Sequence, residues 1–347
     1  MKPVESEPLQ DINWDRLKFT ITPTRSMYLA RCDLGEEWAP GELVPFGEIP
    51  ISPAAGVLNY GQGVFEGTKA FRSVKDRVVL FRPGRNARRF KDSAERLCIP
   101  PVPEELFLEA VVSTVKDNED FIPPLDKGSL YIRPCIWGTG PVLGVKPAPA
   151  YTFVVYVSPV GPYFKGGMTC LHLKVTRFFH RAAPKGTGDA KAIGNYAASL
   201  YPLKLAKENG FDEVVYLNAA NENWVEEVGS ANLFILKDNV LKTPRLGGSI
   251  LPGVTRDSVI EIARDMLGLE VHELDIPVDE VLKADEVFCT GTAAVITPIG
   301  EITTDQDNRV IGENVGRVTQ ELYDILTGIQ TERRKDPYEW VYPISEY

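Results

Sequence analysis

The sequence predicts an α+β protein built from two domains, and three observations lead to this fold class. The 347 residues are enough for two domains of ordinary size, each with its own core. Strand-like and helix-like segments are mixed without the strict alternation of a doubly wound parallel sheet. The segment "PYFKGGMT" has two glycines and little apolar content, as expected between domains. We expect a small N-terminal α/β domain over 1–165, a linker over 166–177 and a larger C-terminal domain over 178–347.

The N-terminal half combines short strands with two helices. Strand-like runs broken by Pro and Gly fill residues 18–51, and "VFEGTKAFRSVKDRVVLFRP" predicts a hairpin that turns at "SVKDR". Apolar residues recur at helical spacing in 83–99 and in 103–118, which predicts two amphipathic helices. Two apolar runs, 128–137 and 150–161, predict buried strands that complete this domain.

The C-terminal half repeats this mixture. A helix is expected over 195–208, with a kink or a late start because Pro202 lies inside it. Further elements are a strand at 212–219, a hairpin at 231–244 that turns at Asp238 and Asn239, a helix at 255–268, a strand at 285–300 and a helix at 314–329. The aromatic tail "DPYEWVYPI" should pack back on the body of the protein or on a second subunit.

Composition excludes several classes of function. The net charge of −10 argues against a general nucleic-acid binder, which needs a basic face. An acidic start and the absence of eighteen consecutive apolar residues predict a cytoplasmic, non-membrane protein. Five widely spaced cysteines and only three histidines argue against a disulfide framework, a zinc site and histidine-based catalysis. Catalytic groups are therefore sought among Lys, Glu, Tyr and Arg, and no metal site is expected.

The stretch "PKGTGDAKAIGNYAASL" places Lys191 among glycines at 186, 188 and 194, just before the expected helix. Glycines allow sharp turns and close approach of another group. A nucleophilic lysine must spend part of its time neutral, which requires a desolvated pocket or a nearby cation, and it forms an imine with an aldehyde. The alternative is that Lys191 is an ordinary loop lysine.

If the aldehyde is pyridoxal phosphate, the protein must hold its phosphate, its ring nitrogen and its phenolate oxygen. Phosphate could be bound by arginines in "FRPGRNARRF", by the backbone N–H groups of Val254 and Thr255 at a helix start, and by Thr292. The arginines could equally form a solvated helix face, and no complete phosphate-loop motif occurs. The arginine candidates are Arg82, Arg85, Arg88 and Arg89.

The acid facing the ring nitrogen is sought in "NWVEEVGSANLF". In a strand Glu226 and Glu227 point to opposite faces, so one can be solvated while the other faces a site. An inward carboxylate needs a cationic partner, which a protonated ring nitrogen supplies. A pair of surface carboxylates explains the same residues equally well. Tyr196, close to the start of the expected helix, could reach the phenolate oxygen or could be a core tyrosine.

Seven ordered motifs resemble those of the fold-type IV pyridoxal-phosphate enzymes, and specifically the branched-chain amino acid aminotransferases. The matches run from about residue 20 to 330 and therefore cover nearly the whole chain. The motifs are "LNYGQGVFEGTKAF", "LFRPGRNARRF", "LYIRP", "GDAKAIGNYAASL", "VEEVGSANLF", "ILPGVTR" and "CTGTAAVITPI". The resemblance implies a D-amino acid aminotransferase-like fold with a small N-terminal domain and a C-terminal pseudo-barrel domain that carries the cofactor lysine.

The resemblance also implies roles for individual residues. Lys191 would bind pyridoxal 5′-phosphate covalently and carry the proton during catalysis, and Glu227 would pair with the ring nitrogen. Tyr196 would bind the phenolate oxygen. The phosphate would be held by Arg89, Val254, Thr255 and Thr292.

On the substrate side, the resemblance implies an aromatic wall and two carboxylate-binding groups. Tyr60, Phe65, Tyr131 and Tyr163 would surround the branched side chain. Arg133 would admit the second carboxylate of glutamate, and the turn at Ala293 and Ala294 would bind the α-carboxylate. Such a wall offers apolar area and no donor, so discrimination among Leu, Ile and Val should be loose.

The sequence departs from the family at two places. Mammalian members carry a redox C-x-x-C after the glycine-threonine turn, where this chain has Ala294 and Thr297, so no thiol switch is expected. Ser230 and Ala231 are smaller than the residues often found there, and the side-chain pocket could be roomier.

The resemblance implies ping-pong transamination from L-leucine, L-isoleucine or L-valine to 2-oxoglutarate, giving branched 2-oxo acids and L-glutamate. Within the same fold the alternatives are a D-amino acid or (R)-amine aminotransferase and an aminodeoxychorismate lyase-like enzyme. A non-catalytic binding protein or a nucleotide-binding protein would be a different class. The family forms homodimers with the active site near the subunit interface, and some members form hexamers, so a homodimer or higher homo-oligomer is expected.

Overall fold

The computed structural model describes residues 2–4, 9–161 and 168–344. Contacts within the chain divide it into two compact units. Unit 1 comprises residues 1–162, 190–194 and 328–347, and unit 2 comprises 163–189 and 195–327. The chain therefore returns to unit 1 twice, for a short segment around Lys191 and for its last residues.

Unit 1 is built on an eight-stranded sheet whose neighbouring strands are antiparallel in the part of the chain described. In spatial order the strands are β20 (Val341–Pro343), β7 (Val78–Phe81), β6 (Thr68–Arg72), β8 (Ser129–Gly138), β9 (Ala150–Val160), β2 (Ser26–Asp33) and β3 (Glu42–Pro45), with β5 (Gly63–Phe65) beside β8. A separate pair is formed by β1 (Lys2–Pro3) and β4 (Gly47–Glu48). The predicted 64–83 hairpin is confirmed as β6 and β7.

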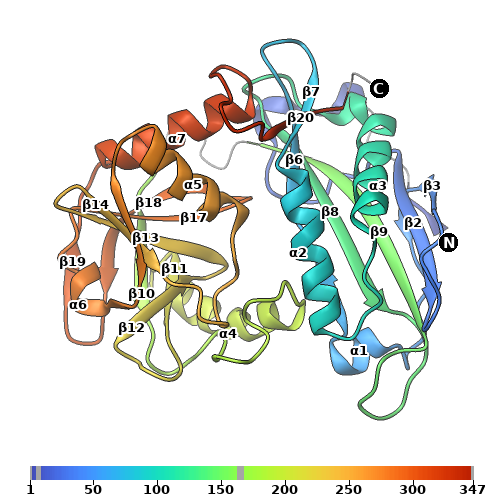
Figure 1. Ribbon diagram of the computed structural model, residues 1–347, viewed down its shortest axis with the longest axis horizontal. Helices are drawn as coiled ribbons and strands as arrows, with labels where there is room; N and C mark the ends of the chain where they lie inside the picture. The colour runs from blue at the N-terminus through green and yellow to red at the C-terminus, as the bar shows by residue number, and fades with distance from the viewer. Residues whose placement is uncertain (1, 5–8, 162–167, 345–347) are drawn as a thin grey trace. The chain divides into compact units, whose positions relative to one another are not determined.

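Two helices, α2 (Pro83–Arg96) and α3 (Glu104–Asp117), lie across one face of this sheet (Figure 1). Both were predicted from their apolar spacing. Pro83 suits the first position of α2 because its missing N–H has no partner to lose there. The rings of Phe90 from α2 and Phe107 from α3 lie 5.2 Å apart, and Phe90 also contacts Phe153 of β9 at 5.6 Å. These aromatic contacts form the centre of the unit 1 core. The short helix α1 (Gly56–Tyr60) lies outside this centre.

The C-terminal tail packs on the other strands of unit 1. This is the first of the two positions predicted for it, the body of the protein. Strand β20 pairs with β7, and Trp340 is 7% exposed. The Trp340 ring meets Phe81 edge-on at 5.7 Å and lies under the Arg82 guanidinium at 4.4 Å. Burial of this apolar surface holds the tail in place.

Unit 2 contains a ten-stranded mixed sheet that closes into a pseudo-barrel. The strands β13, β17, β18, β10, β11 and β12 follow one another, and β12 pairs back with β13. Its strands are β10 (Leu171–Val175), β11 (Glu213–Leu217), β12 (Trp224–Val228), β13 (Ala231–Lys237), β14 (Val240–Pro244), β15 (Glu270–Leu274), β16 (Ile276–Pro277), β17 (Glu286–Gly291), β18 (Val295–Thr303) and β19 (Asn308–Val310). Aliphatic side chains such as Leu173, Val215 and Leu233 fill its core.

The helices of this part of the chain are α4 (Gly194–Glu208), α5 (Val254–Asp265), α6 (Val278–Val281) and α7 (Arg317–Gln330). A kink or a late start was expected for α4, and the late start is wrong, because the helix begins at Gly194 and contains Pro202. A proline in a helix removes one backbone donor and does not prevent the preceding turns from forming. The helix predictions for α5 and α7 are confirmed.

Two turns in unit 2 test the strand predictions. Asp238 and Asn239 both have positive φ, at 49° and 64°, as a tight two-residue hairpin turn requires, and the predicted hairpin is confirmed. The single strand predicted at 285–300 is wrong, because β17 and β18 pair as a hairpin through Gly291 and Val295. Apolar runs on both sides of the small residues 291–294 hid this turn.

The predicted linker, 166–177, is partly a strand. Residues 166 and 167 lie outside the described residues, and Leu171–Val175 forms β10, which pairs in parallel with β11 and β18. Among the described residues, no helix combines the length and the apolar character needed to cross a bilayer.

Candidate active site

The segment 190–194, which carries Lys191, is joined to unit 1 by backbone hydrogen bonds along β5. The Phe65 N–H donates to the Lys191 carbonyl oxygen, N···O 3.2 Å, and the Ile193 N–H donates to Gly63, 3.1 Å. From α2, Ser93 Oγ accepts the Lys191 N–H at 2.9 Å. The sequence predicted this lysine to belong to the C-terminal domain, and these contacts group it with unit 1 instead. A main-chain pairing of this kind leaves no local signature in the sequence.

The side chain of Lys191 lies beside an aromatic ring and in a cationic setting. Its Nζ is 4.9 Å from the centre of the Phe65 ring, and the Arg133 guanidinium is 4.6 Å from the same centre. Desolvation, reinforced by the charges of Arg89 and Arg133, lowers the pKa of Lys191 to about 8. A lysine with this pKa has a substantial neutral fraction near neutral pH and can act as a nucleophile or a base.

Glu66 follows β5 directly and is fully buried. Arg89 Nε donates to Glu66 Oε1 at 2.7 Å, and Arg89 Nη2 donates to Oε2 at 3.0 Å. Asn86, one turn earlier on α2, donates to Oε2 at 2.8 Å. Burial would raise the pKa of Glu66, but the charges of Arg89 and Lys191 and these hydrogen bonds hold it below its usual range. The sequence reasoning missed Glu66, although a single carboxylate inside an apolar run was a usable signal.

Tyr131 and Arg133 project from the same face of β8, because they are two residues apart in a strand. Arg133 Nη2 donates to the Tyr131 hydroxyl at 2.9 Å. A Cβ at Gly67 would lie 2.2 Å from that hydroxyl, so only glycine fits opposite it. Lys69, also missed by the sequence reasoning, is the cross-strand partner of Tyr131, and desolvation lowers its pKa to about 8.

The other predicted wall residues are placed differently. The Tyr60 hydroxyl accepts the Gly144 N–H at 2.7 Å, and its side chain is largely exposed. Tyr60 is therefore tied to the loop that follows β8. Tyr163 lies outside the described residues.

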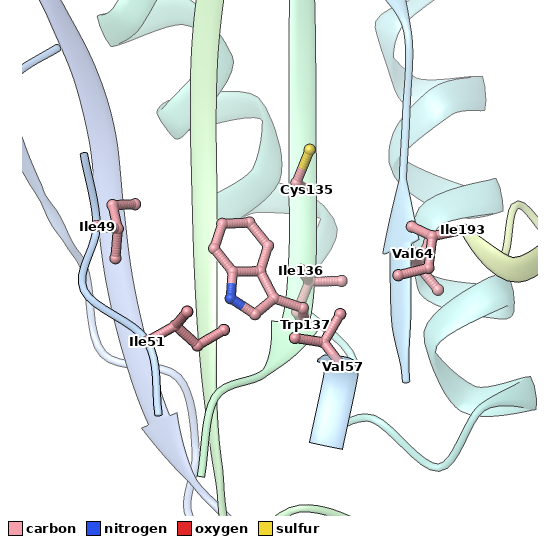
Figure 2. Close-up of a pocket in the computed structure, with 8 residues that line it drawn as sticks. All are labelled: Ile49, Ile51, Val57, Val64, Cys135, Ile136, Trp137 and Ile193. Atoms are coloured by element: carbon pink, nitrogen blue, oxygen red, sulfur yellow. The ribbon is translucent and has the colours of Figure 1, made fainter. Parts of the chain in front are cut away.

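An apolar pocket of about 270 Å³ lies in unit 1 beside β5 and β8. Figure 2 shows Trp137 at its centre, with Val64 and Ile193 on one side and Ile49 and Ile51 on the other. Val64 and Ile193 are sequence neighbours of Phe65 and Lys191, but they face this pocket. Its lining residues are Ile49, Ile51, Val57, Val64, Cys135, Ile136, Trp137 and Ile193. The pocket contains none of the predicted substrate residues.

In unit 2, Glu227 is a buried carboxylate on β12 with a cationic partner. Arg181 Nη2 forms an ion pair with Glu227 Oε2, and both side chains are less than a tenth exposed. Asn232 Nδ2 donates to Glu227 Oε1 at 3.1 Å and to the Leu251 carbonyl at 3.0 Å. Arg181 also donates to the Ser249 carbonyl, and a Cβ at Gly188 would lie 2.2 Å from that same oxygen. The loop that precedes Lys191 thus supplies the cation, a residue that the sequence reasoning missed.

The neighbouring Glu226 is buried too, contrary to the expectation that one of the two carboxylates could be solvated. Its Oε1 accepts hydrogen bonds from Asn218 Nδ2 at 2.7 Å and from Ser249 Oγ. The strand does place the two carboxylates on opposite faces, but other elements cover both faces.

The N-terminus of α5 has the features of an anion site. Its N-cap is Gly253, which makes no side-chain cap, so the N–H groups of the first turn are not satisfied by a capping side chain. Val254 and Thr255 occupy this first turn. A Cβ at Gly253 would lie 2.1 Å from Asn232 Oδ1. Asn232 therefore links the carboxylate of Glu227 to the start of this helix.

The remaining predicted residues lie at a helix start and at a turn. Tyr196 is in the first turn of α4, where Asn195 Nδ2 donates to the Thr187 carbonyl at 2.6 Å. Thr292, Ala293 and Ala294 form the turn between β17 and β18. The next residue, Val295, has φ 58°, which is strained for a β-branched residue. Strain of this kind is often stored at functional sites.

Each unit has its own reactive features. Unit 1 contains a lysine of low pKa and a guanidinium held by two hydrogen bonds to a carboxylate, and unit 2 contains a buried carboxylate and an uncapped helix N-terminus. Within the described residues, no group of three His, Cys, Asp or Glu side chains is arranged to hold a metal ion.

Comparison with known proteins identifies the family of this chain. The sequence profile of the family described as "Amino-transferase class IV" matches residues 63–302. Branched-chain-amino-acid aminotransferase 5, chloroplastic, of Arabidopsis thaliana is 50% identical over 338 residues, which is 97% of this chain and 81% of that protein. Branched-chain amino acid aminotransferase 1, mitochondrial, of Humulus lupulus is 46% identical over 98% of this chain and 86% of its own length.

A solved structure agrees as well. The T.th. branched-chain amino acid aminotransferase with pyridoxamine 5′-phosphate superposes with a TM-score of 0.79 at 32% identity. The superposition covers 92% of this chain and 99% of that one. The predicted two-domain α+β fold with a pseudo-barrel is confirmed by this likeness and by the closed ring of strands in unit 2.

The predicted cytoplasmic location is wrong by the same comparison. Several relatives that match nearly the whole chain are named as chloroplastic or mitochondrial proteins. The expectation came from an acidic start without an apolar stretch, and organelle targeting segments are amphipathic and do not need one.

Proposed function

The chain belongs to the class IV aminotransferases, and from this we propose that it is a branched-chain amino acid aminotransferase that uses pyridoxal 5′-phosphate. It transfers the amino group of L-leucine, L-isoleucine or L-valine reversibly to 2-oxoglutarate, in two half-reactions. The observation that carries the proposal is the setting of Lys191, whose pKa is lowered to about 8 between an aromatic ring and two arginines.

The residues fit the cofactor. Bound pyridoxal phosphate supplies an electron-withdrawing ring that stabilises negative charge on the substrate α-carbon. A guanidinium and an uncapped helix N-terminus suit its phosphate, and a buried carboxylate suits a protonated ring nitrogen. The proposed cofactor residues are Lys191, Arg89, Tyr196, Glu227, Val254, Thr255 and Thr292.

Lys191 is proposed to move the proton at the substrate α-carbon. This role needs a group that is a base in one half-step and an acid in the next, and a pKa near the working pH serves both. Glu227 is proposed to keep the ring nitrogen protonated. Such a role requires an anionic group at this position, and the ion pair between Glu227 and Arg181 is consistent with one.

The substrate is proposed to be bound by aromatic and cationic groups. The Phe65 and Tyr131 rings both contact the Arg133 guanidinium, at 4.6 and 5.2 Å, so apolar area and a positive charge adjoin each other. Such a surface can accept an aliphatic side chain in one half-reaction and the second carboxylate of glutamate in the other. Tyr60, Tyr163, Ala293 and Ala294 complete the proposed substrate set.

We further propose that the protein is a homodimer or a higher homo-oligomer. The loop that follows β8 exposes two large aliphatic side chains almost completely, Leu143 and Val145. Adjacent exposed apolar side chains of this kind favour burial against a partner.

The visible absorption spectrum of the purified protein tests the function. Cofactor bound to Lys191 gives a visible band, and L-leucine without an oxo acid should abolish that band as the cofactor takes up the amino group. A band that responds only to D-alanine or an (R)-amine would indicate the alternative activity of the same fold. A protein that shows no band after addition of pyridoxal phosphate would contradict the cofactor assignment.

A further inference from the structure

The environment of Glu66 is a closed network of three chain segments in unit 1. Glu66 follows β5, Arg89 and Asn86 come from α2, and Lys191 lies in the segment paired with β5. The same helix also holds the Lys191 backbone through Ser93 Oγ, at 2.9 Å. The Glu66 backbone takes part, because its N–H donates to the Pro134 carbonyl on β8 at 2.8 Å. The backbone that carries this carboxylate is therefore held in place by the sheet.

Both oxygens of this carboxylate are engaged. Oε1 accepts from Arg89 Nε at 2.7 Å, and Oε2 accepts from Arg89 Nη2, from Asn86 Nδ2 and from the Gly67 N–H, at 3.0, 2.8 and 3.1 Å. A guanidinium is planar, so two parallel hydrogen bonds along its Nε–Nη2 edge fix both the plane and the direction of the group. The position of the Arg89 charge is thus set by Glu66.

Charge balance argues that this pair serves more than packing. A buried ion pair contributes little net stability by itself, because desolvation offsets the attraction. Arg89 lowers the pKa of Lys191 and Glu66 raises it, so both groups act electrostatically on the reactive lysine. Arg89 and Lys191 are cations and Glu66 is an anion, so the cluster carries an excess positive charge when Lys191 is protonated, and this charge favours an anionic ligand such as a phosphate.

We propose that Glu66 is a positioning residue of the cofactor site, which orients the Arg89 guanidinium so that it can bind the cofactor phosphate. The proposal rests on the proposed function, which assigns Arg89 to that phosphate. Glu66 acts through Arg89 and does not itself touch the cofactor. The network through Asn86 and Ser93 then couples the orientation of Arg89 to the placement of Lys191.

The test measures how strongly the apoenzyme, prepared from the full-length chain, prefers pyridoxal 5′-phosphate to pyridoxal, which lacks the phosphate. Dissociation constants are measured by absorbance in a phosphate-free buffer for the wild type and for Glu66→Gln. We expect the variant to bind pyridoxal phosphate about tenfold or more weakly while its affinity for pyridoxal changes less than about twofold. An equal loss for both ligands would mean a merely structural role and would overturn the proposal.

Glu104→Gln is the matched control. Glu104 pairs with Arg88, the residue next to Arg89 on α2, at 2.5 Å, but on an exposed face. This variant removes the same charge from the surroundings of the same helix and should leave both affinities unchanged. A tenfold loss of phosphate preference in the control as well would overturn the proposal, because a general effect of charge would then explain the result.

Two further variants, Glu66→Asp and Arg89→Lys, separate the positioning role of Glu66 from the phosphate assignment of Arg89. Glu66→Asp retains the charge but withdraws the carboxylate from the guanidinium, so it should also lose the preference, and it substitutes for Glu66→Gln if that variant does not fold. Arg89→Lys tests the phosphate assignment itself. If Arg89→Lys loses the preference and neither Glu66 variant does, the positioning role fails and the proposed function stands. If Arg89→Lys keeps the preference, the phosphate assignment of Arg89 fails.

Discussion

The backbone of Lys191 is hydrogen-bonded to that of Phe65, with the Phe65 N–H donating to the Lys191 carbonyl oxygen over 3.2 Å. The two residues are far apart in the chain, and this bond places the lysine ammonium over the Phe65 ring, 4.9 Å from its centre. A backbone pairing therefore fixes the position of this lysine of lowered pKa. The surroundings of these and other residues lead to five predictions.

The first concerns the acidity of Lys191. In the cofactor-free protein its pKa should be about 8, so about one molecule in ten carries a neutral amine at pH 7, against about one in three thousand for an ordinary lysine. Competitive labelling across pH with peptide mapping measures this value. Mapping must resolve Lys191 from Lys69, whose pKa is also lowered to about 8. A half-point near 10.5 for Lys191 would contradict the prediction.

Glu227→Gln should lower transamination of L-leucine by about a hundredfold, because Glu227 is proposed as the anionic partner of the ring nitrogen. It should also lower the free energy of unfolding of the apoenzyme by about 3 kcal/mol, since Arg181 is left buried without its carboxylate. Steady-state rates and urea unfolding measure the two effects. The control is Glu226→Gln on the opposite face of β12, which should lose stability but keep its rate. Equal losses of rate in both variants would refute the assignment.

Arg133→Met should raise the KM for 2-oxoglutarate about thirtyfold and change the KM for L-leucine little. The guanidinium proposed to bind the second carboxylate is lost, while the apolar contact with Phe65 is largely kept. Half-reaction kinetics with each substrate separate the two effects. Arg72→Met is the control, because Arg72 lies on the neighbouring strand β6 and faces Glu119 on the surface. A parallel rise in both KM values would argue against a carboxylate-binding role.

The stability of unit 1 should depend on pH through Glu332. Hydrogen bonds from Arg77 and Lys75 outweigh its burial and lower the pKa of Glu332 to about 2, and its side chain is 7% exposed. A carboxyl whose folded pKa is depressed stabilises the protein above its unfolded pKa, and this contribution is lost as the pH falls through its folded pKa.

Glu332→Gln should therefore cost about 3 kcal/mol of unfolding free energy at pH 7. The difference from wild type should begin to shrink below about pH 5 and nearly vanish near pH 2. Urea titrations at several pH values measure it. A difference that does not change with pH would mean that the hydrogen bonds alone, and not the charge, stabilise the tail.

Activity should not respond to thiol oxidants. Ala294 and Thr297 stand where the resemblance leads us to compare this chain with a redox cysteine pair, and neither is a cysteine. Burial raises the pKa of Cys135 and of Cys289 to about 12. Cys98 is exposed and should react first with iodoacetamide. Mass spectrometry measures the modification of each cysteine, and transamination assays on the same samples measure the activity. Two results would contradict the prediction. One is a loss of activity in proportion to the alkylation of Cys98, and the other is a loss of activity after peroxide that a reductant restores.

The sequence by itself determined the local elements of this protein. Helices α2, α3, α5 and α7 followed from apolar residues at helical spacing, and the β13–β14 hairpin followed from Asp238 and Asn239 at its turn. The ordered motifs also identified the family, and they predict that Lys191 is the cofactor lysine. These features depend on residues close together in the chain, so their physical cause is present in any short window of sequence.

Only the tertiary structure decided which side chains act on one another. Glu66 meets Arg89 through the packing of α2 on β5, and Arg181 meets Glu227 through the loop that precedes Lys191. The return of 190–194 to unit 1 and the hairpin hidden in 285–300 were decided in the same way. Each arises from pairing between distant segments. Burial excludes water there and strengthens electrostatic interactions and hydrogen bonds. No local pattern records such encounters. Arg181 therefore emerged from the fold alone, and the place of Glu66 inside an apolar run indicated a buried carboxylate but not its partner.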